Sequence, residues 1–274
     1  MFQSKRKPTT GIGGAMAMGE LIYHSVVRSV RKQHNNALVA IGINMMQAVL
    51  FVAAFFIMFS LLGIRGSALR GDFLVYIMSG IFLYLTHIKA LGSVMGAEGP
   101  SSPMMQHAPM NTIIAILSSA MSALYVQVLS LFLILFIYHV AWNPIEIDQP
   151  IAAFGMLLLS WFTGCAMGLV LLAMKPWFPS VVAIIAMVYQ RANMIASGKM
   201  FVANTLPGYM LAMFDWNPLF HIIDQARGFA FLNYYPRYSD WAYAFWIGVF
   251  CVVIGMMGEF YTRKHASLSW DARR

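Results

Sequence analysis

The chain has 274 residues, of which 60% are hydrophobic and only 10% are charged, and its formal net charge is +8. Soluble domains carry about 25% charged residues, and a soluble fold of this size could not bury so much apolar surface, so the composition excludes an ordinary soluble protein and predicts a polytopic membrane protein. The positive charge does not indicate nucleic-acid binding, because the basic residues flank hydrophobic segments and suit anionic lipid headgroups instead.

The chain begins with a basic, polar stretch, residues 1–18, which we expect to be a cytoplasmic tail and not a signal peptide, because no apolar core follows it at once. Residues 19–36 predict an amphipathic interface helix. Its apolar face is formed by Ile22, Tyr23, Val26, Val27 and Val30, and its polar face by Glu20, His24, Arg28 and Arg31. Such a helix could lie along the inner membrane surface or pack on a partner protein, and the two are compatible.

Six hydrophobic stretches in the rest of the chain are long enough to cross a membrane, which takes about 20 residues. In chain order they are Leu38–Gly63, Phe73–Ala97, Ile113–Trp142, Ile151–Met174, Ser180–Gly198 and Trp241–Thr262. We therefore expect an all-α fold in which residues 38–262 form a six-span transmembrane domain and residues 263–274 a second cytoplasmic tail. An even number of spans places both ends of the chain on one side of the membrane.

Basic residues show which side that is. Cytoplasmic flanks collect Lys and Arg, and the side that holds the termini carries twelve of them against six on the other side, so we expect both termini in the cytoplasm. The twelve are Lys5, Arg6, Lys7, Arg28, Arg31, Lys32, Lys89, Lys175, Arg263, Lys264, Arg273 and Arg274, and the six are Arg65, Arg70, Arg191, Lys199, Arg227 and Arg237.

The segment Ala97–Thr112, between the second and third spans, is rich in proline and almost free of charge. Prolines followed by a helix-capping Asn111 or Thr112 favour a short structured element over a floppy tether. This element could be a docking surface. It could equally be a plain connector, because none of its residues is chemically specific.

Arg191 interrupts the fifth span, where a charged side chain is costly. It could face protein or a water-filled passage, or its long side chain could extend to the outer surface. The segment that follows, Lys199–Asp240, is the longest outside the spans and contains two apolar pieces too short to cross. We expect these pieces to re-enter the outer leaflet, where an irregular backbone is tolerated if it lines a cavity.

The second apolar piece begins within the motif WNPLFHIIDQARG, residues 216–228. Asn217 and Pro218 predict the start of a helix, because Asn caps free amide groups and Pro suits the first helical position. Downstream, the spacing of three residues places His221 and Asp224 on one helical face, where they could act as acid and base. The same face brings Arg227 next to Asp224, and we favour a pair that neutralises charge near lipid.

No pattern in the chain predicts catalysis on its own. The sequence contains no GxxxxGK[ST] phosphate loop, no HExxH, no GxSxG and no GxGxxG after a strand, so ATP hydrolysis by this chain is not expected. Cys165 and Cys251 lie in apolar runs and are expected to pack. The pairs Gly92/Gly96 and Gly164/Gly168 follow the GxxxG spacing, which serves packing within a chain or between two copies.

Aromatic residues gather in the segment before the sixth span and include Trp216, Tyr234 and Tyr235. A belt of Trp and Tyr at the membrane interface is the default interpretation of such a cluster. The alternative is the lining of a sugar pathway, because aromatic faces suit the apolar faces of sugar rings.

These features, in this order, resemble the permease subunits of type-2 ABC exporters, in particular the KpsM-like group that exports capsular polysaccharide. RANMIASGKMF, residues 191–201, is similar to that group's arginine followed by a Ser-Gly-hydrophobic turn. WNPLFHIIDQAR resembles its Asn-Pro-x-x-His-x-x-acid-x-x-Arg signature, and Tyr234, Tyr235 and Asp240 also fit. The resemblance covers nearly the whole chain, but only its last third is specific.

The resemblance implies a homodimer in the bacterial inner membrane, bound to two copies of a separate ATPase that holds the ATP and Mg, with no cofactor bound by this chain. A lipid-linked glycan would be the substrate, and a polysaccharide co-polymerase and an outer-membrane channel would continue its path. The residues implied in ATPase coupling are Arg28, Arg31, Glu98, Pro103, His107, Pro109 and Asn111. Those implied in the substrate pathway or outer gate are Arg191, Trp216, Asn217, Pro218, His221, Asp224, Arg227, Tyr234 and Tyr235.

The sequence departs from the family pattern in two places. After Pro109 it has Asn111 and then no charge until Glu146, where the family often has an acidic residue and an arginine, and Asp224 stands where Glu is usual. Two alternatives stay open. One is an exporter of the same fold for O-antigen, teichoic acid, a lipid or a drug, and the other is a membrane-embedded enzyme that acts on lipid-linked sugar through His221 and Asp224.

Overall fold

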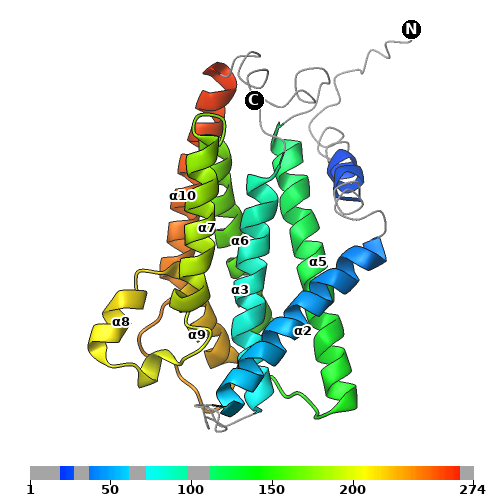
Figure 1. The fold of residues 1–274 in the computed structure, drawn as a ribbon, viewed down its shortest axis with the longest axis vertical. Helices are drawn as coiled ribbons and strands as arrows, with labels where there is room; N and C mark the ends of the chain where they lie inside the picture. Colours follow the sequence, from blue (N-terminus) through cyan, green and yellow to red (C-terminus); the bar gives the residue numbers. More distant parts are fainter. Residues whose placement is uncertain (1–18, 28–36, 62–71, 98–111, 266–274) are drawn as a thin grey trace.

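The structure, a computed structural model, describes residues 19–27, 37–61, 72–97 and 112–265. Within these ranges all regular structure is helical, and six helices are long and apolar enough to cross a membrane (Figure 1). The all-α, six-span prediction is therefore confirmed at this level. The residues predicted to couple to an ATPase lie outside the described ranges; they are Arg28, Arg31, Glu98, Pro103, His107, Pro109 and Asn111.

The six long helices match the predicted spans to within a few residues. They are α2 (Ala37–Leu61), α3 (Phe73–Met95), α5 (Thr112–Ala141), α6 (Pro150–Met174), α7 (Pro179–Ala196) and α10 (Trp241–His265). Between α7 and α10 the chain forms a 3-10 turn, η1 (Ala203–Thr205), and two short helices, α8 (Gly208–Phe214) and α9 (Pro218–Ala230). Residues 19–27 are helical and fall within the predicted interface helix, whose remainder, residues 28–36, is outside the description.

Local sequence signals explain where several helices begin. Before α3, the side chain of Asp72 accepts a hydrogen bond of 2.8 Å from the amide of Leu74, which satisfies one of the free donors of the first turn. Pro150 and Pro179 open α6 and α7 at the position where the missing amide hydrogen costs nothing. Gly198, with φ of 74°, follows the end of α7 in the left-handed conformation that glycine adopts without strain.

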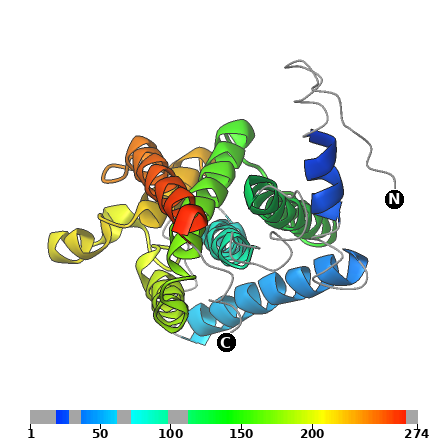
Figure 2. The ribbon, with the colours of Figure 1, turned by 90° about the horizontal axis from the view of Figure 1, so that it is seen from above.

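Helices α3 and α6 form the centre of the bundle. In their most apolar stretches 78% and 61% of residues are buried, against 17–28% in the other four spans. Viewed along the bundle, α3 lies in the middle, with α2, α5, α6 and α7 around it (Figure 2). The outward faces of α2, α5, α7 and α10 are therefore left for lipid or for other protein chains.

The α3–α6 contact depends on two glycines. A Cβ on Gly164 would collide with the backbone carbonyl of His87, and a Cβ on Gly168 would lie 2.7 Å from the carbonyl oxygen of Leu91. The Gly164/Gly168 pair thus packs two helices of the same chain. An added Cβ would meet nothing within 4 Å at Gly92 and only carbonyls of its own helix at Gly96, so among the described residues the other predicted pair packs against no second helix in this way.

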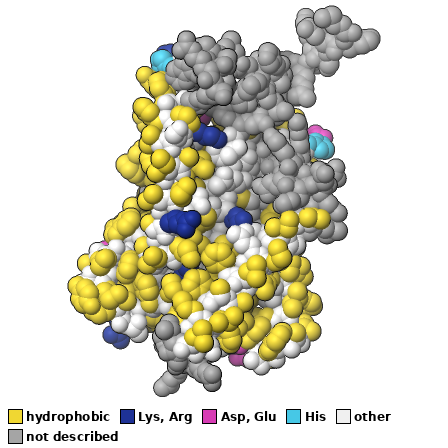
Figure 3. Space-filling model, in the orientation of Figure 1, with side chains coloured by type: hydrophobic (Ala, Val, Ile, Leu, Met, Phe, Trp, Pro, Cys, Tyr) yellow, Lys and Arg dark blue, Asp and Glu magenta, His cyan; other side chains and the backbone are white. Residues whose placement is uncertain are grey.

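Where Figure 3 shows described residues, hydrophobic side chains cover much of the surface of the bundle, and basic side chains interrupt them in only a few places. Large hydrophobic side chains point outward from every one of the four outer spans. They include Met46 and Leu50 of α2, Phe132 and Phe136 of α5, Ile184 and Met187 of α7, and Trp246 and Phe250 of α10. Such a surface is incompatible with water and fits the bilayer that the composition predicts.

We predict that Gly164→Ala lowers the stability of the bundle. The added methyl group pushes α3 away from α6 at a backbone contact that cannot yield, and overpacking of this kind costs about 1–3 kcal/mol. Gly155→Ala is the matched control, because it lies on the same helix and its added methyl group would meet nothing within 4 Å. Thermal unfolding of the purified protein in detergent measures both, and equal midpoints for the two variants would contradict the role given to Gly164.

Candidate functional site

The motif at residues 216–228 forms α9, at the end of the bundle where α7 ends and α10 begins (Figure 1). The side chain of Asn217 accepts a hydrogen bond of 3.0 Å from the amide of Leu219, and Pro218 follows at the first helical position, as predicted. Asn217 also donates to the side chain of Asn193 at 2.9 Å and to the carbonyl of Ala196 at 3.0 Å. The helix cap is thereby tied to the end of α7.

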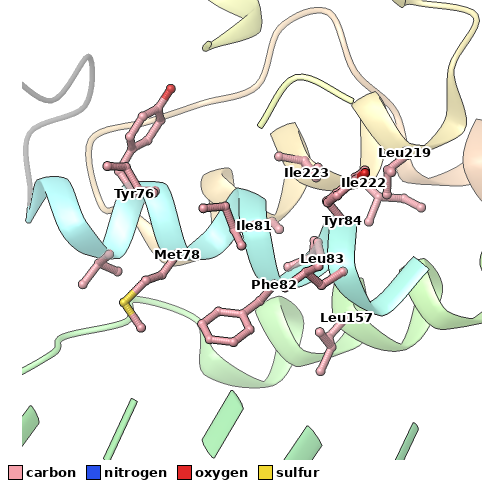
Figure 4. Packing of buried hydrophobic residues seen from close by; sticks show 14 of the residues in the cluster. Tyr76, Met78, Ile81, Phe82, Leu83, Tyr84, Leu157, Leu219, Ile222 and Ile223 are labelled. Carbon is pink, nitrogen blue, oxygen red and sulfur yellow. The ribbon is translucent and has the colours of Figure 1, made fainter. Parts of the chain in front are cut away.

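Helix α9 is buried on nearly all sides, which is unusual for a 13-residue helix outside the spans. Leu219, Ile222 and Ile223 pack with α3 and with Leu157 of α6 in one continuous core (Figure 4). The remaining faces hold polar side chains that are also buried, among them Asp224 and Arg227. Since buried polar groups must find partners, the contacts of these two residues decide how the segment is held.

Arg227 binds the turn that follows α7. Its guanidinium donates to the carbonyls of Gly198 at 2.9 Å, Phe201 at 2.6 Å and Lys199 at 2.6 Å. The left-handed backbone of Gly198 turns the chain so that these carbonyls converge on one point. The guanidinium also lies 4.3 Å from the ring centre of Tyr76 on α3, and the residue is only 1% exposed. Arg227 therefore links α9, the post-α7 turn and α3.

Lys199, in the same turn, extends its side chain away from Arg227 and into an aromatic cage. Its ammonium lies 3.6 Å from the ring centre of Tyr84, 5.0 Å from that of Phe55 and 5.6 Å from that of Phe51. The residue is 3% exposed, and its Nζ has no hydrogen-bond partner among the residues that the structure describes. Burial lowers the pKa of Lys199 to about 8. The ring faces favour the charged form, so the cage holds a cation at neutral pH.

Asp224 has different partners from Arg227. Its carboxylate accepts hydrogen bonds from the Tyr234 hydroxyl at 2.5 Å and from the Ser239 hydroxyl at 2.7 Å. Burial, with the nearby Asp224 charge, raises the pKa of Tyr234, so this phenol stays a donor. The expected Asp224–Arg227 ion pair is wrong: within the described structure the two groups form no salt bridge, because each has nearer partners in a different segment.

His221 is held by the backbone on both sides of its ring. Nε2 lies 2.5 Å from the carbonyl oxygen of Asp215, and the amide of Asp240 donates to Nδ1 at 2.9 Å. These partners assign the proton to Nε2, which donates, and leave Nδ1 as an acceptor. The ring also contacts that of Tyr243, with centroids 4.6 Å apart. In this arrangement both nitrogens of His221 and both carboxylate oxygens of Asp224 already have partners.

The other predicted site residues are not gathered at this network. Trp216 and Tyr235 are 61% and 81% exposed, whereas Tyr234 is buried against Asp224. Arg191 is exposed on α7, about 8 Å along the helix axis from its end at Ala196. Of the two apolar pieces predicted to re-enter the membrane, α9 is buried in protein, and α8 has no buried residue and projects from the bundle (Figure 1).

Three residues of the network were not predicted. Tyr76 is far from Arg227 in the chain, and no sequence pattern marks Ser239 as a partner of Asp224. Lys199 was counted as a basic residue flanking a span, and no aromatic cage was predicted for it. Only for Lys199 did the sequence contain a usable signal. It stands directly between a Ser-Gly turn and the apolar stretch MFVA, a position that favours burial of its side chain.

No group of three or more His, Cys, Asp or Glu side chains that could hold a metal ion occurs in the part of the chain that the structure describes. The sequence matches no protein-family model that was compared with it and no curated protein. The fold thus defines a class of protein: the described structure is all-helical and has six candidate membrane spans. A buried polar network holds the segment between the last two of them.

We predict that the stability of the protein rises with pH because of Lys199. Its pKa of about 8 in the fold lies below that of a free lysine, about 10.4, so between these values the unfolded chain binds more protons. The cost of the buried ammonium is fully present below about pH 8 and disappears as the pH approaches about 10.4. At about pH 7 the thermal midpoint of the wild-type chain should therefore lie below that of a Lys199→Met variant. At about pH 10 the difference between the two midpoints should be much smaller.

The Lys199→Met variant is itself the control, since every other group titrates equally in both proteins. It keeps the apolar contacts with the cage and removes the charge. A difference between the two midpoints that stays constant across this pH range would contradict the buried, destabilised ammonium.

Proposed function

We propose that this chain is the permease subunit of an ABC transporter that exports a lipid-linked, capsular-type polysaccharide across a bacterial inner membrane. It acts as a homodimer with two copies of a separate ATPase, which binds ATP and Mg and supplies the energy. Both termini lie in the cytoplasm, and α9 lies at the outer end of the spans. Residues 98–111 and the N-terminal helix contact the ATPase, and a co-polymerase and an outer-membrane channel receive the product.

One observation carries this proposal. The residues that resemble the permease signature, Asn217, His221, Asp224 and Arg227, form one buried helix whose polar contacts all go to the segments around it. The segment holds buried polar side chains, packs on the central helix α3 and lies between the last two spans in the chain. Such a segment is suited to close a pathway. Its opening would require only that a defined set of hydrogen bonds be exchanged.

An exposed arginine on α7 supports an assembly of two copies of the chain. Arg191 is exposed on this span, and an arginine that faced hydrocarbon there would be costly. Next to it in sequence, the side chain of Gln190 lines a polar cavity. The exposed side chains that share the face of Arg191 are apolar, namely Ile184, Val188 and Ile195. An apolar face that carries one cation is better placed against protein than against lipid, which fits a homodimer that meets along α7.

A second cavity favours a cargo that carries a lipid. It measures about 600 Å³, lies between α2, α3 and α5, and is lined mainly by apolar side chains such as Val49, Phe56 and Ile137. Asp72 and Tyr138, which are hydrogen-bonded to each other, lie at its lining as well. An apolar volume of this size suits an acyl or polyprenyl chain. An exporter of another lipid-containing cargo, such as O-antigen, teichoic acid or a lipid, is therefore the second candidate.

The enzyme alternative has less support. A general base needs a free acceptor and a general acid a proton that can reach substrate. His221 is engaged by two backbone groups and Asp224 by two hydroxyls, and no hydrogen bond joins the two side chains. A purified chain that converts lipid-linked sugar without ATP would nevertheless establish that alternative and overturn the proposed one.

The most direct experiment is purification of the tagged chain from its native membrane in mild detergent. A permease of this kind should bring with it a protein that carries a GxxxxGK[ST] phosphate loop, and deletion of the chain should abolish surface glycan. Loss of a different surface molecule, with glycan unchanged, would favour the second candidate. A clean isolated chain whose deletion changes neither would contradict both.

We predict that Asp224→Ala reduces export about tenfold or more at equal protein level in the membrane. The change leaves the Tyr234 and Ser239 hydroxyls without their shared acceptor, at a cost of about 1–3 kcal/mol each, and frees the end of α9. Cys165→Ala and Cys251→Ala are the controls, because both thiols are unpaired and only partly buried. Surface glycan is measured with the protein level, and normal export by Asp224→Ala would contradict a gating role.

A further inference from the structure

A polar cavity lies within the membrane-spanning part of the fold, apart from the α9 network. It has a volume of about 560 Å³, is partly enclosed, and is lined by residues of α2, α3, α5 and α7. Polar and apolar groups contribute about equally to its lining. The polar lining residues are Asn44, Gln47, Lys89, Ser93, Gln127 and Gln190. Polar side chains are expensive at this depth, so a cluster that faces a common space indicates a ligand or a pathway.

The amide groups in the cavity satisfy one another only in part. Gln127 donates to the side-chain oxygen of Asn44 at 3.1 Å, and Asn44 donates to the hydroxyl of Ser130 at 3.1 Å, which ties α2 to α5. The side-chain amides of Gln47 and Gln190 have no hydrogen bond to any residue that the structure describes. Hydrogen-bonding capacity therefore remains for a ligand that carries hydroxyl groups.

Lys89 is the one charged residue of the lining. It lies on α3 six positions before Met95, about 9 Å from that end of the helix. Its ammonium forms no hydrogen bond or ion pair within the described ranges, and the cavity lining contains no Asp or Glu. A cation in a partly enclosed space without a counter-ion attracts an anion, and a lysine binds phosphate as a point charge.

We propose that this cavity binds a phosphate group together with the hydroxyls attached to it, as found in a sugar phosphate or a glycerol phosphate headgroup. Lys89 faces the phosphate, and Gln47, Gln127 and Gln190 face the hydroxyls. The site deepens the proposed function and rests on it for the identity of the cargo, because the junction between glycan and lipid anchor has this chemistry. The headgroup of an ordinary anionic phospholipid has it too.

The test measures binding and needs neither the ATPase nor export. The full chain is purified, reconstituted with phosphatidylglycerol or phosphatidylcholine, and its retained lipid is counted by native mass spectrometry. The wild-type chain should retain phosphatidylglycerol in preference to phosphatidylcholine. Lys89→Gln should weaken that retention about tenfold, since a hydrogen bond to a charged group is worth about that factor. Lys89→Arg, which keeps the charge, should retain it.

Two further measurements show whether the ligand binds at Lys89 and which kind of molecule carries its phosphate. Lys264→Gln removes the same charge from an exposed position near the end of α10, and its lipid retention should match that of the wild-type chain. Glucose 1-phosphate should displace phosphatidylglycerol, and glucose alone should not, if the site accepts a sugar phosphate. Displacement by neither, with retention still dependent on Lys89, supports the phospholipid headgroup as the occupant.

Equal retention by the wild-type chain and Lys89→Gln, or equal loss in Lys89→Gln and Lys264→Gln, would overturn the site. Either result would leave the exporter proposal standing if surface glycan still depends on the chain. Conversely, binding could depend on Lys89 while deletion of the chain leaves surface glycan unchanged. The binding site would then stand, and only the glycan would be excluded as its cargo.

Discussion

The structure between α7 and α10 depends on how one arginine is buried. Arg227 has almost no contact with solvent, and its charge is balanced by three backbone carbonyls and the face of Tyr76. Those carbonyls belong to a turn that exists because Gly198 adopts a left-handed conformation. Both terminal nitrogens of the guanidinium are bonded, and only Nε has no partner among the described residues. A charge this deep needs such bonds, so the geometry of the guanidinium sets the position of α9 relative to α3 and α7.

The rest of the segment follows from this anchor. With Arg227 committed to the turn, Asp224 is left to bind Tyr234 and Ser239, which draws the chain back over α9 before α10 begins. His221 then bonds the backbone of Asp215, just before α9, and of Asp240, just before α10. The three ionisable residues of the motif thus serve three separate contacts. Groups that looked like the components of an active site hold a compact element at one end of a membrane-spanning bundle.

Sequence reasoning predicted what depends on local chemistry. The six long apolar helices follow from runs of apolar residues, and the start of α9 follows from Asn217 and Pro218, so both were confirmed. The Asp224–Arg227 pair was wrong, because helical spacing shows which side chains can meet but not which partners compete for them. The competing carbonyls and hydroxyls come from residues 10 to 29 positions away. The cage around Lys199 likewise depends on α2 and α3, which no local pattern connects to it.

The most direct test of this account replaces Arg227 by Lys, which keeps the charge but cannot reach three carbonyls. Hydrogen exchange on the purified chain should become faster in residues 198–201 and in α9, and the free energy of unfolding should fall by about 2–5 kcal/mol. Arg237→Lys, at an exposed position in the same segment, should behave like the wild-type chain. If Arg227→Lys left both the exchange pattern and the stability unchanged, the segment would not be anchored by Arg227.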